Sequence, residues 1–250
     1  MSRHFSFFAL SRTFALLTAC VLLASSAFAQ RLTPTNLPDK SGTVGVAPGW
    51  KLTDGGKGAA ILTGPHGALL MLGIPVPAAA ENVESQFPGV PGPLFPGMQR
   101  VDFSDPVRTY IDVMHANAPK SGAKLVRLRA VENVPWDTGR AAYIRATASL
   151  KGVRMEVFGL FAVMPTDSTQ GLFYYSEMSA PSTDFQRIYP TMMAMWKSWS
   201  LNPQTLKDRL NGAAKALAEV DFAGTVDSVV SARREAAEHA AAQWDSYIRQ

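Results

Sequence analysis

The sequence contains one cysteine, Cys20, which lies in an apolar N-terminal segment. A chain that loses this segment has no disulfide, no thiol nucleophile and no thiolate ligand for a metal. Histidine is scarce as well, and His66, His115 and His239 stand far apart, without the spacing of metal ligands. The sequence therefore predicts no metal site and no bound cofactor.

Charge is also sparse. Charged residues make up 18% of the chain and form no long run of one sign, whereas hydrophobic residues make up 47%, enough for a sizeable core. Loss of Arg3 and Arg12 with the N-terminal segment leaves 22 basic against 20 acidic residues, a net charge of +2. So small a charge does not favour a nucleic-acid partner.

Residues 1–29 have the three parts of a secretory signal peptide: basic residues, the apolar run TFALLTACVLLA, and AFA before Gln30. Cleavage after Ala29 predicts a periplasmic or secreted protein. No later apolar run is long enough to predict a transmembrane span. Alternatively, LTAC at 17–20 resembles a lipoprotein lipobox with Cys20 as the lipidated residue, although the apolar run continues beyond this cysteine.

Three segments follow the signal peptide. Residues 30–42 are polar and turn-rich, and we interpret them as a leader without a core of its own. Residues 43–202 alternate short apolar runs with turn residues, which predicts an α+β domain: an antiparallel sheet of short strands and hairpins flanked by helices. Residues 203–250 predict a helical tail, whose short apolar seam suits packing on the domain, self-association or a partner.

Alternation of polar and apolar residues predicts strands at 123–131, 141–150, 153–164 and 171–179. Lys151-Gly152 has the composition of a two-residue hairpin turn.

Two helices are expected in the domain. Ser104 or Asp105 can cap a helix that starts at Pro106 and ends before Pro119. The second lies within 182–199, where Pro190 predicts a short first turn and a main helix from about Tyr189. The Pro/Gly-rich residues 87–97 predict a surface loop.

The stretch GWKLTDGGKGAAILTGPHGA, residues 49–68, suggests a phosphate-binding loop at first sight. A nucleotide P-loop needs Ser or Thr after its Gly-Lys pair and a helix behind it. Here Gly58 follows Lys57, and the pattern that follows is that of a strand. We expect two turns instead, Asp54–Gly58 and Gly64–Gly67, which join three strands.

No catalytic motif stands out, and no catalytic residue is predicted. There is no G-x-S-x-G elbow, and the S-x-x-K match at Ser121–Lys124 lies in a turn rather than at the start of a buried helix. Helix capping explains Asp102 and Asp105.

Three scattered acids keep one alternative function open. Glu132, Glu156 and Glu177 could gather under the 87–97 loop as the site of a hydrolase-type enzyme. A deep polar pocket that held two or more of the four residues Glu132, Glu156, Glu177 and His115 would favour this alternative.

Four arginines form a positively charged set. Arg127 and Arg129 share a face of one predicted strand, and Arg145 and Arg154 lie on neighbouring strands. This face is a candidate site for an anionic envelope component, such as a phosphorylated lipid or glycan. The simpler interpretation is a solvated face on which Glu156 and Glu177 balance the charge.

The order of expected elements resembles the PsbP-like α+β fold of exported accessory proteins, over about residues 41–202. The residues that carry the resemblance are few: PGW at 48–50, then Phe185, Trp196, Ser198 and Trp199. The resemblance implies a binding or accessory module and transfers no catalytic residue. We therefore predict an exported, non-enzymatic binding or accessory protein of the cell envelope, with an envelope protein or an anionic envelope component as its partner.

Overall fold

The structure is a computed structural model that describes residues 31–81, 99–136, 139–166 and 168–204. From Leu32 onward these residues belong to one compact unit. The signal peptide with Cys20, the loop 87–97, His239 and the tail beyond residue 204 lie outside the described residues.

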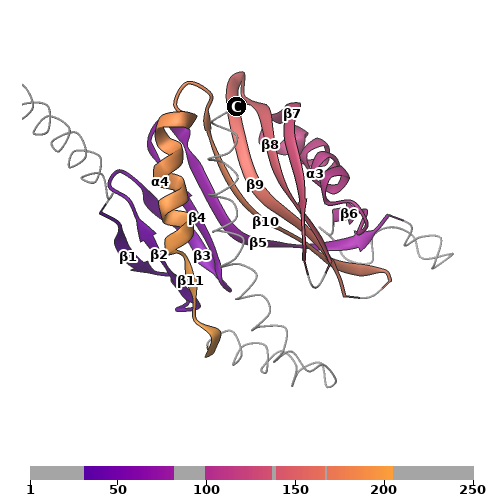
Figure 1. Cartoon of the computed structure of the whole chain (residues 1–250), viewed down its shortest axis with the longest axis horizontal. Coiled ribbons are helices and arrows are strands. Elements are labelled where there is room, and N and C mark those ends of the chain that lie inside the picture. Colours follow the sequence, from indigo (N-terminus) through magenta and orange to yellow (C-terminus); the bar gives the residue numbers. More distant parts are fainter. Residues whose placement is uncertain (1–30, 82–98, 137–138, 167, 205–250) are drawn as a thin grey trace, which may run out of the picture. The chain divides into compact units, whose positions relative to one another are not determined.

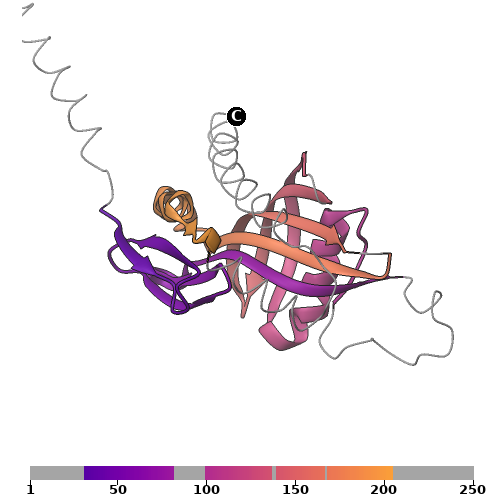
Figure 2. The ribbon, with the colours of Figure 1, turned by 90° about the horizontal axis from the view of Figure 1, so that it is seen from below.

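Most of the described chain forms one large sheet with the strand order β3-β4-β5-β10-β9-β8-β7, beside which β6 pairs with β5 (Figures 1 and 2). Its neighbouring strands are antiparallel, except for the parallel pair β5–β6. A small second sheet has the order β1-β2-β11. The strands are β1 (Thr33–Asn36), β2 (Gly42–Val46), β3 (Lys51–Gly56), β4 (Ala59–Thr63), β5 (Leu69–Ala80), β6 (Gln99–Val101), β7 (Ala123–Val134), β8 (Arg140–Leu150), β9 (Val153–Pro165), β10 (Gln170–Pro181) and β11 (Ser200–Leu201).

Two helices, α3 (Pro106–Ser121) and α4 (Phe185–Ser198), pack against opposite faces of the large sheet. Alternation along β8 shows this division, since Ile144 belongs to the core under α3 and Tyr143 to the core under α4. Trp196 of α4 is 1% exposed and lies in the core under α4. The α+β fold with a helix-flanked antiparallel sheet is thereby confirmed. Neither described helix is long and apolar enough to cross a bilayer.

The glycine-rich stretch 49–68 forms turns, not a phosphate loop. β3 and β4 are joined by Lys57 and Gly58, both in the left-handed region with φ of 52° and 81°. The short 3-10 helix η1 (Pro65–Gly67) joins β4 to β5. No helix begins at Lys57, and two turns join three strands as predicted. The first turn is shorter than the predicted Asp54–Gly58, because β3 continues to Gly56.

Both helices run through a proline at which the sequence predicts a boundary. α3 includes Pro119 and ends at Gly122, whose φ of 72° and N–H bond to the Ala118 carbonyl form the C-cap. α4 starts at Phe185, not near Tyr189, and contains Pro190. Both prolines are exposed, so each carbonyl left without an intrahelical partner can be solvated.

The predicted polar leader contributes structure. Its residues Thr33–Asn36 pair with β2 as strand β1, and Leu37 is 1% exposed in the core under α4. The segment 30–42 therefore packs on the domain from Leu32 onward.

Candidate functional site

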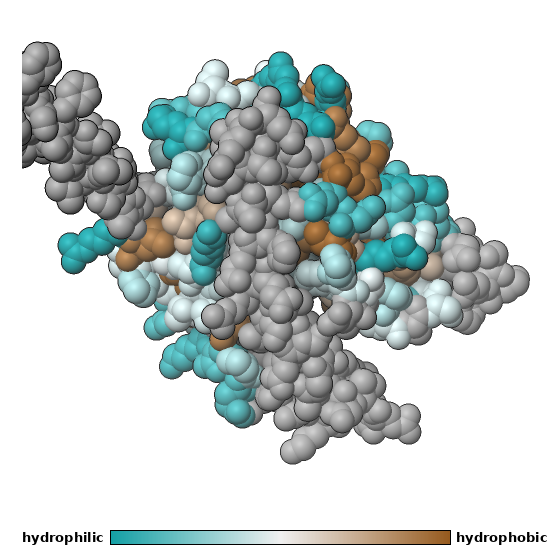
Figure 3. All heavy atoms as spheres, viewed as in Figure 1, coloured by the Kyte–Doolittle hydropathy of each residue, from teal (hydrophilic) through white to brown (hydrophobic). Residues whose placement is uncertain are grey.

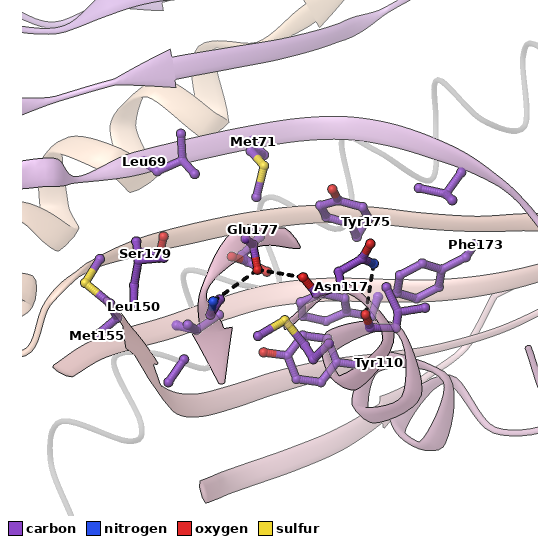
Figure 4. Close-up of a pocket in the computed structure, with 18 of the residues that line it drawn as sticks. Leu69, Met71, Tyr110, Asn117, Leu150, Met155, Phe173, Tyr175, Glu177 and Ser179 are labelled. Atoms are coloured by element: carbon purple, nitrogen blue, oxygen red, sulfur yellow. Dashed lines mark hydrogen bonds between the residues drawn. The ribbon is translucent and has the colours of Figure 1, made fainter. Parts of the chain in front are cut away.

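A largely apolar cavity of about 470 Å³ lies between α3 and the sheet face beneath it (Figure 4). Small-molecule pockets have volumes of roughly 300–1,000 Å³, so the cavity is large enough for a ligand. The helix contributes one stripe of side chains at helical spacing: Tyr110, Val113, Met114, Asn117 and Ser121. The strands contribute mostly aliphatic and aromatic side chains, among them Leu69, Met71, Ala148, Leu150, Met155, Val157, Phe161, Phe173 and Tyr175.

Local sequence signals place α3 over the cavity. The Asp105 carboxylate accepts hydrogen bonds from the N–H groups of Val107 and Arg108, at 2.9 and 3.0 Å, which fixes the start of the helix. Gly122 ends it and leads the chain directly into β7. The predicted cap at Asp105 is therefore confirmed, and the last turn of the helix lies at the cavity wall.

Glu177 is the only charged side chain among the described residues that line the cavity. Burial raises the pKa of its carboxyl from the usual 4.5 to about 7. A shift in register between β10 and β5, at Tyr175 and Glu177, marks a bulge beside it. There the Gly73 N–H donates to the Ser176 hydroxyl at 2.9 Å. The extra residue lies in β5, and plain alternation with Phe173 and Tyr175 puts Glu177 on the cavity side of β10.

Tyr110 brings a second polar group to the cavity. Its side chain is 2% exposed and packs on Phe161 with ring centroids 4.4 Å apart. Its hydroxyl makes no hydrogen bond to any described residue. Burial, then the nearby charge of Glu177, raise the pKa of this phenol, and the same causes raise the pKa of Tyr175 to about 12.

The remaining polar groups on α3 are satisfied within the helix and its C-terminal turn. The Asn117 amide donates to the Val113 carbonyl at 2.9 Å. The Ser121 hydroxyl donates to the Asn117 carbonyl at 3.0 Å and accepts from the Ala123 N–H at 3.1 Å (Figure 4). Tyr110 is therefore the polar group of α3 best placed to bind a polar atom of a ligand, and Glu177 is the one charged group among the described lining residues; Gln99, Tyr175 and Ser179 also line the cavity.

The three predicted acids do not come together. The Glu156 side chain projects from the face of β9 opposite to the cavity. Phe158 and Leu160 point to the same side of the strand and lie in the core under α4. Glu132 of β7 pairs with Tyr143 of β8, and Glu156 of β9 pairs with Thr147 of β8. Tyr143 and Thr147 are four residues apart, so the two acids are offset by roughly 13 Å along the strands. His115 is exposed on α3. Of the four groups named in the enzyme hypothesis, only Glu177 lines the cavity.

The four predicted arginines do share a face, the one opposite to the cavity. Arg127 pairs with Thr147, and Arg154 pairs with Ser149, two residues along the same strand. Arg129 and Arg145 lie 3.6 and 3.8 Å from the Glu156 carboxylate.

Glu156 is 8% exposed and therefore balances part of this charge from within the arginine face. Glu177, on the other face of the sheet, does not. The surface in Figure 3 shows hydrophobic atoms interspersed with hydrophilic ones over β7, β8 and β9. Exposed apolar side chains on these strands are Val126, Val131, Leu150 and Val153.

Within residues 31–81, 99–136, 139–166 and 168–204, no three His, Cys, Asp or Glu side chains are grouped so that they could hold a metal ion. The structure thus offers no candidate ligand set among these residues.

No protein-family model and no curated protein sequence matches the chain. Solved structures do match. Cyanobacterial PsbP from Synechocystis sp. PCC 6803 is 9% identical, over 71% of this chain and 96% of that one, with a TM-score of 0.38. LpqN of Mycobacterium tuberculosis, described as involved in cell envelope biogenesis, is 12% identical, over 70% of this chain and 88% of that one, with a TM-score of 0.37. The first of these structures belongs to the family that the sequence resembles, and at such identities and TM-scores the matches carry no further argument about fold, ligand or partner.

Proposed function

We propose that this chain is an exported, non-enzymatic binding protein of the cell envelope, and that the cavity between α3 and the large sheet takes a small apolar molecule. Export rests on the signal-peptide pattern of residues 1–29. The cavity itself supports the binding role, because its walls are mainly aliphatic and aromatic side chains with few polar groups.

The position of the acids supports binding rather than hydrolysis. General acid–base catalysis by two carboxyl groups needs both within reach of one substrate. Glu177 lines the cavity, whereas Glu156 pairs with Arg129 and Arg145 on the opposite face of the sheet.

The experiment uses the processed protein purified from the periplasm of a bacterial host, with its N-terminus determined by mass spectrometry. The neutral probe N-phenyl-1-naphthylamine should gain fluorescence as it enters the cavity. Val113→Trp fills the cavity from α3 and should weaken probe binding about tenfold or more. Ala116→Trp introduces the same side chain at an exposed position of the same helix and should bind the probe like wild type. Equal binding by both variants, with circular dichroism spectra like that of wild type, would refute the proposal.

A further inference from the structure

We infer that the cavity selects apolar molecules with a single amine, whose ammonium group lies between the Glu177 carboxylate and the Tyr110 hydroxyl, and that it rejects apolar carboxylates and phosphates. This inference rests on the proposed function and names the class of ligand for the same cavity.

The first argument is the sign of the charge inside the cavity. The elements around Glu177 present few titratable groups: Tyr110 from α3 and Tyr175 from β10. β5, β8 and β9 contribute apolar side chains, such as Met71, Ala148 and Val157, and no Lys, Arg or His lies among the described lining residues. An anionic head group would lose its hydration and meet no positive charge among the described lining residues, only the like charge of Glu177 and neutral donors, whereas an ammonium would meet a counter-ion.

The second argument is the Tyr110 hydroxyl. It is buried and has no hydrogen-bond partner among the described residues. Leaving such a group unsatisfied destabilises a protein. A phenol oxygen accepts a hydrogen bond from an ammonium, so an amine could satisfy Tyr110 and Glu177 with two of its three N–H groups.

The third argument concerns protons. Before binding, Glu177 is largely protonated below pH 7 because burial raises its pKa to about 7. When an ammonium binds, the carboxyl releases its proton to solvent and the ammonium keeps its own. Amine affinity should therefore rise with pH, by up to tenfold per pH unit below 7, and level off above it.

The test compares three molecules that differ only in head group: octylamine, 1-octanol and octanoate. Each displaces N-phenyl-1-naphthylamine from the processed protein at pH 5.5 and pH 8. At pH 8 octylamine should bind about tenfold or more tightly than octanoate, and its lead over octanol should shrink at pH 5.5. Glu177→Gln should bring the amine-to-alcohol affinity ratio to within about threefold of unity. Glu156→Gln, a matched change on the other face of the sheet, should leave this ratio unchanged.

Each outcome decides a separate question. Binding of octanoate as tight as that of octylamine, or an amine preference that persists in Glu177→Gln, would overturn the inference while leaving the proposed function in place. Failure of the neutral probe and of octanol to bind would overturn the proposed function and the inference together.

Discussion

Glu156 and Glu177 lie on the neighbouring strands β9 and β10, but their side chains leave opposite faces of the sheet. Glu156 pairs with Ala180, three residues from Glu177, and an odd separation along a strand changes the face. Glu156 lies beside two guanidinium groups, whereas Glu177 lines an apolar cavity and has a pKa of about 7. Two acids of one sheet therefore have different chemistry, and different responses to substitution are expected.

Glu177→Gln should change the pH dependence of stability. The folded pKa of about 7 exceeds the usual 4.5, so the unfolded chain releases this proton first as pH rises. Wild-type stability should therefore fall between about pH 4.5 and 7, and the variant should not show this loss. At pH 8 the variant should be more stable by roughly 1–3 kcal/mol. The range lies below the free energy equivalent to the full pKa shift, because the Glu177 side chain is partly exposed to solvent. Thermal unfolding at pH 4 and pH 8 measures this. A difference between the proteins that is the same at both pH values would contradict it.

Glu156→Gln should destabilise the domain by about 1–3 kcal/mol, because it removes a buried carboxylate that lies between Arg129 and Arg145. Urea denaturation measures the change. Asp112→Asn is the control, since Asp112 pairs with Arg108 at 3.7 Å on the surface of α3, and exposed pairs contribute about 0–1 kcal/mol. Equal losses of stability in the two variants would show that Glu156 does not stabilise the arginine face.

Gly73→Ala should destabilise the bulge beside Glu177. Its φ is 66°, and an added Cβ would lie 2.5 Å from the Trp199 ring. Gly67→Ala is a matched control, with φ of 79° and open space around the added atom. The control should lose about 1–2 kcal/mol from backbone strain alone, and Gly73→Ala should lose more, by about 1–3 kcal/mol. If chemical denaturation gives the same loss of unfolding free energy for both variants, Trp199 does not pack closely on Gly73 in the folded protein.

Tyr110→Phe should leave stability unchanged or raise it by up to about 1 kcal/mol, because the lost hydroxyl is buried without a partner. Denaturation in urea of the protein without ligand checks this. A loss above about 1 kcal/mol would mean that the hydroxyl has a hydrogen-bond partner in the folded protein.

The sequence predicted the turns and strands of the sheet well, because they depend on local residues. Lys151 and Gly152 adopt φ of 49° and 84° and join β8 to β9, as the hairpin pattern indicated. The helix boundaries near Pro119 and Pro190 were wrong, because solvation of an exposed helix surface, which no local pattern records, allows a proline inside the helix.

The candidate site was harder to predict. Alternation along each strand does not by itself show that Glu156 and Glu177 lie on opposite faces of the sheet. That conclusion also needs the pairing register of β9 and β10, which depends on the whole sheet. The cavity and the role of Tyr110 depend on how α3 packs on the sheet, a contact between distant segments. The stripe Tyr110, Val113, Met114, Asn117 and Ser121 was the one signal in the sequence, and it does not distinguish a cavity wall from a closed core.

Methionine methyl groups on the two sides of the sheet report whether a small apolar molecule occupies the cavity. Met71 and Met114 line the cavity from β5 and α3, whereas Met178 and Met195 lie in the core under α4. Methyl NMR of protein labelled with ¹³C at methionine, titrated with 1-octanol, should show saturable shifts of Met71 and Met114 and little change at Met178 and Met195. Shifts confined to the second pair, or no saturable shift at Met71 and Met114, would show that the cavity does not bind this molecule.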